Sequence, residues 1–494
     1  MEFNYLTTII LLPLVGSLVV AFIPGLSERW IRWISAVLTL ASFVLAIIIF
    51  AGFDRAVGGI QFEEKVSWIQ SIGAHYHLGV DGLSLPLVAL TAFLGFVVVL
   101  ISWKEQKRVR EYFAWLLLLE ASILGVFCSL DMLLFFVFWE IEVIPMYFLI
   151  SIWGTGRKDY SSIKYVLYTL FGSAFMLAGI VSLYFATGSL NIVEISEGGL
   201  GMVQSVMPAA ALFWLLIIAF MVKLPVFPLH TWLPDAHTDA PTAGSVMLAG
   251  ALIKMGGYGM IRVCVSMFPD VARNFAPLML TLAVISILYG AALTLRQTDL
   301  KRMIAYSSVS HMGYVLLGIF ALNEVSLTGA GLQMLSHGLL TGLLFAMAGL
   351  TMHNVEERDL RKLGGLAKQM PVIAVVFSIA GLGSLGLPLT SGFAAEFITF
   401  TGSFTSTAVN GVEVFTILAV LGVVLAAGYI LWMIQRTFYG PVLEQYNGVK
   451  DADNREKVYM FAFVILIMVI GIYPAIMTDV IKLAISPIAA LIGG

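Results

Sequence analysis

The sequence has few charged residues, and this shortage excludes most soluble folds. Charged residues make up 12% of the 494 residues, whereas about a quarter is usual in a soluble protein. Hydrophobic residues make up 60% of the chain, and the formal net charge of −3 provides no basic field for nucleic acid. The composition therefore predicts a polytopic membrane protein that does not bind nucleic acid.

Cysteine is also scarce, which bears on redox cofactors. The two cysteines, Cys128 and Cys264, lie far apart in apolar stretches and form no C-x-x-C pair. Two thiols cannot hold a four-cysteine iron–sulfur cluster, and the histidines are not spaced like metal ligands. We therefore expect no metal and no cofactor in this chain.

No nucleotide-binding motif occurs in the sequence context that such a site requires. The segment Gly381-Leu-Gly383-Ser-Leu-Gly386 matches G-x-G-x-x-G, but it lies inside an apolar span without a strand before it or a ribose-binding acid after it. We interpret it as helix packing near Pro388. The N-terminus lacks the positive region of a signal peptide, so its apolar stretch is predicted to be a retained first helix.

Long hydrophobic runs, by contrast, fill the chain. A membrane-spanning helix needs about 20 apolar residues. This length predicts fourteen spans, at residues 4–23, 31–52, 83–102, 112–130, 132–152, 162–187, 208–229, 242–267, 276–296, 302–322, 326–352, 371–400, 412–438 and 457–480.

The distribution of lysine and arginine supports this count. With the N-terminus outside, 20 of the 27 basic residues fall in inside segments, five fall in outside segments, and Lys223 and Lys254 lie within spans. Basic residues gather on the inside of membrane proteins. We therefore expect both termini on the outer face of the membrane.

The order of the spans suggests a weak internal repeat within a single transmembrane domain, residues 1–494. Residues 1–111 hold three helices, residues 112–267 a first set of five, residues 276–438 a second set and residues 457–494 a C-terminal helix. Because five is odd, the second set (helices 9–13) enters from the opposite face to the first (helices 4–8). Helices 7 and 12 are both expected to be interrupted, at Pro225 and Pro388, and each carries a buried charge.

Four charges lie deep within apolar spans: Glu140, Lys223, Lys254 and Glu396. A charge at the bilayer centre costs about 2.5–3.5 kcal/mol, and such residues usually mark an ion or proton path. A lysine removed from water can exchange its proton near neutral pH, and a nearby carboxylate holds that proton in place. The alternative is a static Lys–Glu pair that joins helices.

Secondary candidates surround these charges. Glu140 and Glu142 are about 200° apart around a helix, so they cannot face one path, and we favour Glu140. Histidine titrates near neutral pH and suits a relay, although a buried histidine can also be a packing residue. The further candidates are Glu120, Glu142, His311, His337, Ser307, Ser308 and Ser310.

Several segments resemble the antiporter-like subunits of respiratory complex I, most closely the subunit M or chain 4 family of NADH:quinone oxidoreductase. The resemblance spans the whole chain and rests on residues 79–84 (GVDGLS), 138–150 (FWEIEVIPMYFLI), 223–250 (KLPVFPLHTWLPDAHTDAPTAGSVMLAG), 252–259 (LIKMGGYG) and 299–314 (DLKRMIAYSSVSHMGY). It implies fourteen helices with two inverted repeats. It also matches Glu140, Lys223, Lys254 and Glu396 to the essential charges, with His311 and His337 between them. Glu142 is an additional acid.

This resemblance implies a proton-translocating subunit of the enzyme complex, with NADH, flavin, iron–sulfur clusters and quinone in partner subunits. It also implies a place in a bacterial inner membrane, with membrane-arm subunits and lipids as the expected partners. The expected path runs from a Lys223–Glu140 pair through His337 and Lys254 to Glu396. The alternatives are a subunit of a multi-subunit Na⁺/H⁺ antiporter or a membrane-bound hydrogenase, a quinone-binding enzyme, and a passive scaffold.

Overall fold

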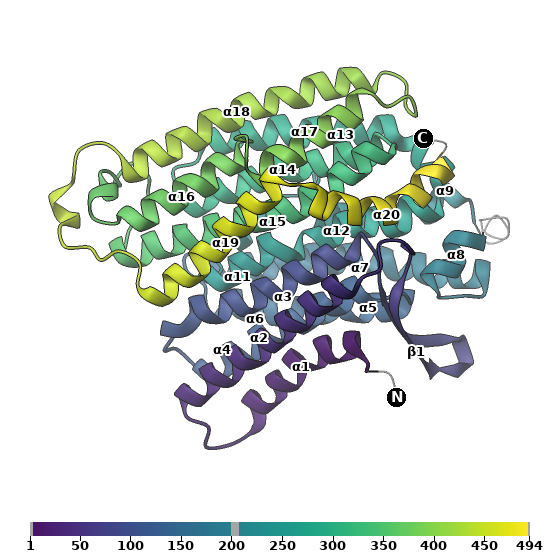
Figure 1. Ribbon diagram of the computed structural model, residues 1–494, viewed down its shortest axis with the longest axis horizontal. Helices are drawn as coiled ribbons and strands as arrows, with labels where there is room; N and C mark the ends of the chain where they lie inside the picture. Colours follow the sequence, from purple (N-terminus) through teal and green to yellow (C-terminus); the bar gives the residue numbers. More distant parts are fainter. Residues whose placement is uncertain (1–2, 199–206, 493–494) are drawn as a thin grey trace.

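The computed structural model describes residues 3–198 and 207–492, and helices make up almost all of its secondary structure (Figure 1). The first part of the chain forms α1 (Tyr5–Phe22), α2 (Glu28–Gly52), α3 (Ser84–Ile101), α4 (Val109–Cys128), α5 (Met132–Ile141), α6 (Val143–Trp153), α7 (Lys158–Thr187), α8 (Ile192–Gly198) and α9 (Ala209–Lys223). The middle forms α10 (Trp232–Asp239), α11 (Thr242–Met247), α12 (Lys254–Gly259), α13 (Pro269–Arg296), α14 (Leu300–Phe320) and α15 (Glu324–Val355). The last part forms α16 (Pro371–Ser384), α17 (Ser391–Phe404), α18 (Val412–Phe438), α19 (Asn454–Ile472) and α20 (Ala475–Ile492).

The predicted all-α membrane class is confirmed, with one small addition. Strands β1 (Gln61–Ile69) and β2 (Ala74–Val80) pair antiparallel, with Lys65 opposite His77. This hairpin lies at the same end of the bundle as both chain ends, on the right in Figure 1. It was not predicted, because a short hairpin between two long apolar helices adds little to a hydropathy pattern.

Twelve helical segments of the described chain are long and apolar enough to cross a membrane, and α9 and α16 are shorter apolar helices. The count of fourteen spans and the inverted repeat stay predictions. Burial differs between the segments: in an apolar 18-residue stretch of α14, of α15 and of residues 242–265, 94% of the residues are buried, whereas in such a stretch of α2 and of α18 only 33% are buried. The outer helices therefore present apolar faces suited to lipid, and the central ones form the core.

Two apolar helices stop where the sequence predicts interruptions. Helix α9 ends at Lys223, and helical structure resumes at Trp232 in α10. Helix α16 ends at Ser384, and α17 begins at Ser391. Proline provides no backbone N–H for a helix, so Pro225 and Pro388 favour both stops.

Two of the predicted spans are less regular than expected. The predicted span 132–152 corresponds to one membrane-length segment, Met132–Trp153, which is irregular at Glu142 between α5 and α6. The predicted span 457–480 is divided at Pro474 into α19 and α20. Pro145 contributes to the first break, because the carbonyl of Ile141 cannot receive its usual hydrogen bond from it. The C-terminal segment therefore contains two helices rather than one.

Candidate functional site

A buried ion pair joins the end of α9 to the break between α5 and α6. The ammonium group of Lys223 contacts Glu142 Oε1, and the two side chains are 1% and 0% exposed. Tyr165 of α7 donates a hydrogen bond to Glu142 Oε2 at 2.7 Å. The ammonium group also lies 5.2 Å from the ring centroid of Trp139. Both carboxylate oxygens of Glu142 are therefore satisfied within the protein.

This pairing corrects the expected partner of Lys223, which is Glu142 and not Glu140. The sequence correctly placed the two glutamates on different faces, but Glu140 was expected to pair with Lys223 and Glu142 is the residue that contacts it. Glu142 stands at the break between α5 and α6, where it points to Lys223 and Tyr165. Glu140 instead lines a surface cavity of about 630 Å³ with apolar residues such as Ile144, and its Oε1 has no partner among the described residues.

Lys254 occupies a short helix between two wider π-helical segments, Leu248–Leu252 and Met260–Val265. Its ammonium group contacts the carbonyl oxygen of Ala249 and lies 2.8 Å from His337 Nδ1. No carboxylate in the described chain pairs with it. π-helical turns inside α-helices are frequent at functional sites because they redirect side chains.

Close packing brings Lys254 and Lys223 onto neighbouring segments. A Cβ atom at Gly256 would lie 2.5 Å from the backbone nitrogen of Leu224, the residue after Lys223. Only glycine permits this approach between α12 and the end of α9. The helix of Lys254 therefore lies directly against the interruption that carries Lys223.

A row of side chains continues from Lys254 to Glu396. The rings of His337 and His311 have centroids 5.5 Å apart, and His311 Nε2 lies 4.0 Å from Glu396 Oε1. The last distance is too long for a direct hydrogen bond but is within reach of one bridging water. His311, His337 and Glu396 line a cavity of about 10 Å³ together with Gln333, which is about the least space that a water needs.

The order within this row differs from the expected path. His337 was expected between Lys223 and Lys254, whereas it lies on the far side of Lys254, beside His311. His311 then lies between His337 and Glu396. The observed order is therefore Lys254, His337, His311, Glu396.

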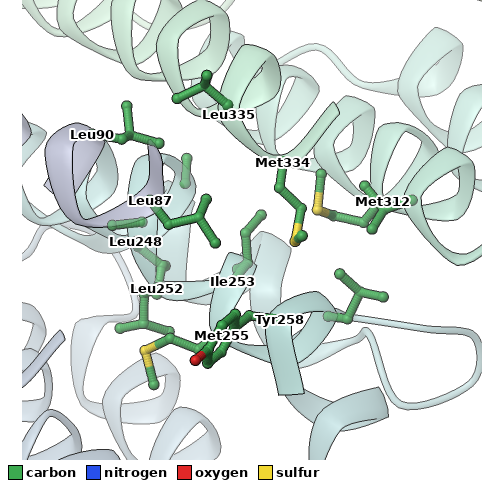
Figure 2. Packing of buried hydrophobic residues seen from close by; sticks show 14 of the residues in the cluster. Leu87, Leu90, Leu248, Leu252, Ile253, Met255, Tyr258, Met312, Met334 and Leu335 are labelled. Carbon is green, nitrogen blue, oxygen red and sulfur yellow. The ribbon is translucent and has the colours of Figure 1, made fainter. Parts of the chain in front are cut away.

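Apolar side chains close off the environment of Lys254. Figure 2 shows the apolar packing around Ile253 and Met255, the neighbours of Lys254 in the sequence, between α3, α12, α14 and α15. The labelled residues are Leu87, Leu90, Leu248, Leu252, Ile253, Met255, Tyr258, Met312, Met334 and Leu335. In such a water-poor region an electrostatic interaction is stronger than it is in water. Any group that exchanges a proton with Lys254 there has to be one of the few polar side chains beside it, such as His337.

The remaining predicted residues lie apart from the row or bond elsewhere. Glu120 of α4 is buried against Gly95, and neither of its oxygens has a partner in the described chain. The hydroxyls of Ser307, Ser308 and Ser310 all donate to backbone carbonyl oxygens, at 2.7, 3.3 and 2.9 Å. These serines therefore bond to the backbone rather than to the histidines.

Three further residues belong near the site and were missed. Tyr165 binds Glu142, and Gln333 lines the cavity beside the histidines. His237 of α10 is fully buried and stacks on Phe345 with centroids 4.6 Å apart. Uncharged polar residues such as Tyr165 and Gln333 give no signal in a hydropathy pattern. The segment that holds His237 was noticed only for its resemblance.

The fold and the site together define an antiporter-like membrane protein, a helical bundle with protonatable side chains at its centre. The chain belongs to the family described as NADH:quinone oxidoreductase/Mrp antiporter, transmembrane, whose model matches residues 129–422. It is 42% identical to NAD(P)H-quinone oxidoreductase chain 4 1 of Synechococcus elongatus, over 99% of this chain and 92% of that one. It is 39% identical to NADH-quinone oxidoreductase subunit M of Rhodobacter capsulatus, over 97% and 95%.

Solved structures agree with this family. A chain of respiratory complex I from Thermus thermophilus is similar with a TM-score of 0.89 and 28% identity, covering 99% of this chain and 100% of that one. A chain of the Mrp complex from Dietzia has the same fold, with a TM-score of 0.86, 19% identity and coverage of 98% and 97%.

Proposed function

We propose that this chain translocates protons as an antiporter-like subunit of the membrane arm of an NADH:quinone oxidoreductase. The observation that carries the proposal is the continuous row Lys254, His337, His311 and Glu396, which ends at a buried carboxyl group. The relatives that are 39–42% identical over nearly the whole chain are named as quinone oxidoreductase chains, which favours this role over that of a cation antiporter.

Within this proposal, Lys223 and Glu142 act as a switch and the row acts as a relay. While Glu142 contacts Lys223, it holds the ammonium proton in place. Separation or protonation of Glu142 would favour release of that proton towards Lys254, whose helix packs against the end of α9. His337 and His311, with water in the adjoining cavity, would carry the proton to Glu396.

Coupling to quinone reduction would come from other membrane-arm subunits. Glu140 faces the bundle surface, where an approaching charge of a neighbouring subunit could act on it. Glu140 is two residues from Glu142, so its charge would bear on the Lys223 pair. NADH, flavin, iron–sulfur clusters and quinone would reside in those partners. Glu120, which lies apart from the row, is a further candidate for proton transfer.

The relay is tested by replacing His337 in the assembled complex. A positioned acid–base group speeds proton transfer by about 10²–10⁴-fold, and a water can replace part of that function. His337→Leu should therefore reduce NADH-driven proton pumping in vesicles by about tenfold or more. Pumping by His337→Gln, which keeps a polar group and room for water, should fall less than pumping by His337→Leu.

Leu339→Ile is the matched control, because it changes a buried residue of the same helix without removing a proton carrier. Normal pumping by an assembled His337→Leu complex would show that the row is a packing feature and does not conduct protons.

For the membrane orientation we propose a bacterial inner membrane with both chain ends on the outer face. Single cysteines at Lys107→Cys and Arg361→Cys should escape a membrane-impermeant maleimide in intact cells and react after lysis, because these basic loops would face inside. Val57→Cys, in a loop near the hairpin, is 76% exposed and should react in intact cells. Labelling of either basic loop in intact cells would reverse the orientation.

A further inference from the structure

A groove outside the proton row lies between α2 and α3, near the end of the bundle that is opposite both chain ends (Figure 1, left). Its cavity measures about 540 Å³. The wall of the groove is apolar, and two of its residues, Val37 and Leu40, are 58% and 41% exposed. The lining residues are Arg29, Arg32, Trp33, Ala36, Val37, Leu40, Phe96, Leu100, Trp103 and Arg455.

The three arginines stand together at one end of this apolar wall. Arg29 and Arg32 belong to the first turns of α2, and Arg455 belongs to the first turn of α19. Helices α2 and α19 begin at that end of the bundle, whereas the residues from Ala36 to Leu40 lie further along α2. The groove therefore has a cationic end and an apolar body.

Most of this positive charge is not neutralised within the protein. Arg32 pairs with Glu28 at 3.1 Å and donates to the carbonyl oxygen of Glu105 at 2.7 Å, but its buried Nε has no partner among the described residues. In that same part of the chain, neither Arg29 nor Arg455 forms an ion pair.

The acids nearest in sequence to Arg455 are already occupied. Asp453 and Glu456 bind Lys104 at 3.0 and 2.8 Å. Arg29 and Arg455 therefore keep their charges without a carboxylate partner among the described residues, and an anion would complement them.

Two tryptophans lie between the arginines and the apolar wall. The rings of Trp33 and Trp103 meet edge to face with centroids 5.2 Å apart, and the guanidinium of Arg455 lies 5.4 Å from the Trp103 centroid. Tryptophan is enriched at the level of lipid headgroups. Along the groove the apolar wall, the tryptophans and the arginines follow one another in space. This order matches a phospholipid, which runs from apolar acyl chains to an anionic headgroup.

We propose that this groove binds one anionic phospholipid, with its phosphodiester at Arg29, Arg32 and Arg455 and an acyl chain along the wall of α2 and α3. Basic pockets between membrane helices on the inner side are suited to anionic headgroups. The bound lipid would join α2 and α19 by a shared contact. A zwitterionic lipid adds a cationic headgroup beside three arginines and is disfavoured.

The test uses the delipidated, assembled complex and two lipids that carry a diazirine in one acyl chain, phosphatidylglycerol and phosphatidylcholine. Photolysis should label the peptides of residues 36–40 and 96–100 from phosphatidylglycerol, and unlabelled phosphatidylglycerol should compete. Each basic residue near a membrane surface contributes about a fivefold gain in affinity. Arg32→Gln should therefore weaken labelling about fivefold, and the triple Arg29→Gln, Arg32→Gln, Arg455→Gln variant on the order of a hundredfold.

Matched variants distinguish a specific lipid-binding site from non-specific electrostatic attraction of anionic lipid. Lys158→Gln, Arg361→Gln and Lys362→Gln together remove the same charge from basic segments that do not line the groove, and this variant should keep the labelling. Arg32→Lys keeps the charge, so it should keep most of the binding even where the triple variant does not assemble. Equal labelling by phosphatidylcholine would show ordinary boundary lipid. Cross-linking of the groove to a neighbouring subunit, with no lipid label, would show a protein interface instead.

Discussion

Replacement of Lys223 by alanine is expected to abolish NADH-driven proton pumping and the coupled quinone reduction while the complex still assembles. Lys223 is the protonatable group that contacts Glu142. A functional replacement at this position would have to bind and release a proton, which alanine cannot do. Loss of such a group should reduce turnover by about 10²-fold or more. Lys223→Arg should also fail, because guanidinium stays protonated at any relevant pH.

A static ion pair predicts the opposite for arginine, which pairs with carboxylates at least as well as lysine does. Full pumping by an assembled Lys223→Arg complex would therefore leave only a structural role. Quinone reduction and vesicle acidification, measured on the same preparation, distinguish the two cases.

Glu142 and Glu140 provide the matched comparison. Breaking a buried ion pair costs about 3–5 kcal/mol, so Glu142→Gln should lower the thermal stability of the complex as well as its pumping. Glu140→Gln should leave that stability nearly unchanged, because Glu140 makes no contact with Lys223. Glu142→Asp should keep part of the activity. A larger loss of stability in Glu140→Gln than in Glu142→Gln would contradict the observed pairing.

Replacement of Lys254 by methionine is the second large expected effect. Methionine nearly preserves the volume but removes the ammonium group that contacts His337, so the row loses its first member. Pumping should fall by about 10²-fold or more, and Lys254→Arg should not restore it. Reconstituted vesicles with a pH-sensitive dye measure this loss.

Met255→Leu is the control for Lys254→Met. It alters the next residue of α12 by a substitution that cores usually tolerate, at a cost below about 1.5 kcal/mol. It should pump normally. If Lys254→Met also pumps normally, protons do not pass through Lys254, and the path must be sought elsewhere.

The sequence predicted the membrane class and the identity of the buried charges because each rests on a strong local signal. Lys223 and Lys254 stand out as charges in apolar runs, and the prolines near Lys223 and Glu396 predicted the helix interruptions. The partner of Lys223 could not be obtained in this way. The choice between Glu140 and Glu142 depends on how α5 and α6 break and rotate, and this follows from packing against α7 and α9 rather than from local propensity.

The π-helical turns beside Lys254 were also beyond the sequence. They lie on either side of α12, where Gly256 packs against the end of α9, and no residue pattern in 242–265 distinguishes them from an ordinary helix. The hairpin of β1 and β2 was missed because a hydropathy window averages over nine residues of mixed polarity.

Lys254, His311 and His337 lie near the middle of residues 242–265, α14 and α15, and Glu396 lies beside His311 next to the interruption between α16 and α17. The row therefore runs across these helices rather than along them, which would place it roughly parallel to the membrane plane. A charge gains or loses about 2.3 kcal/mol per 100 mV only when it moves through the transmembrane voltage. A proton that moves along the row would thus cross almost none of that voltage. An applied potential should therefore act on proton uptake and release rather than on the transfers between them.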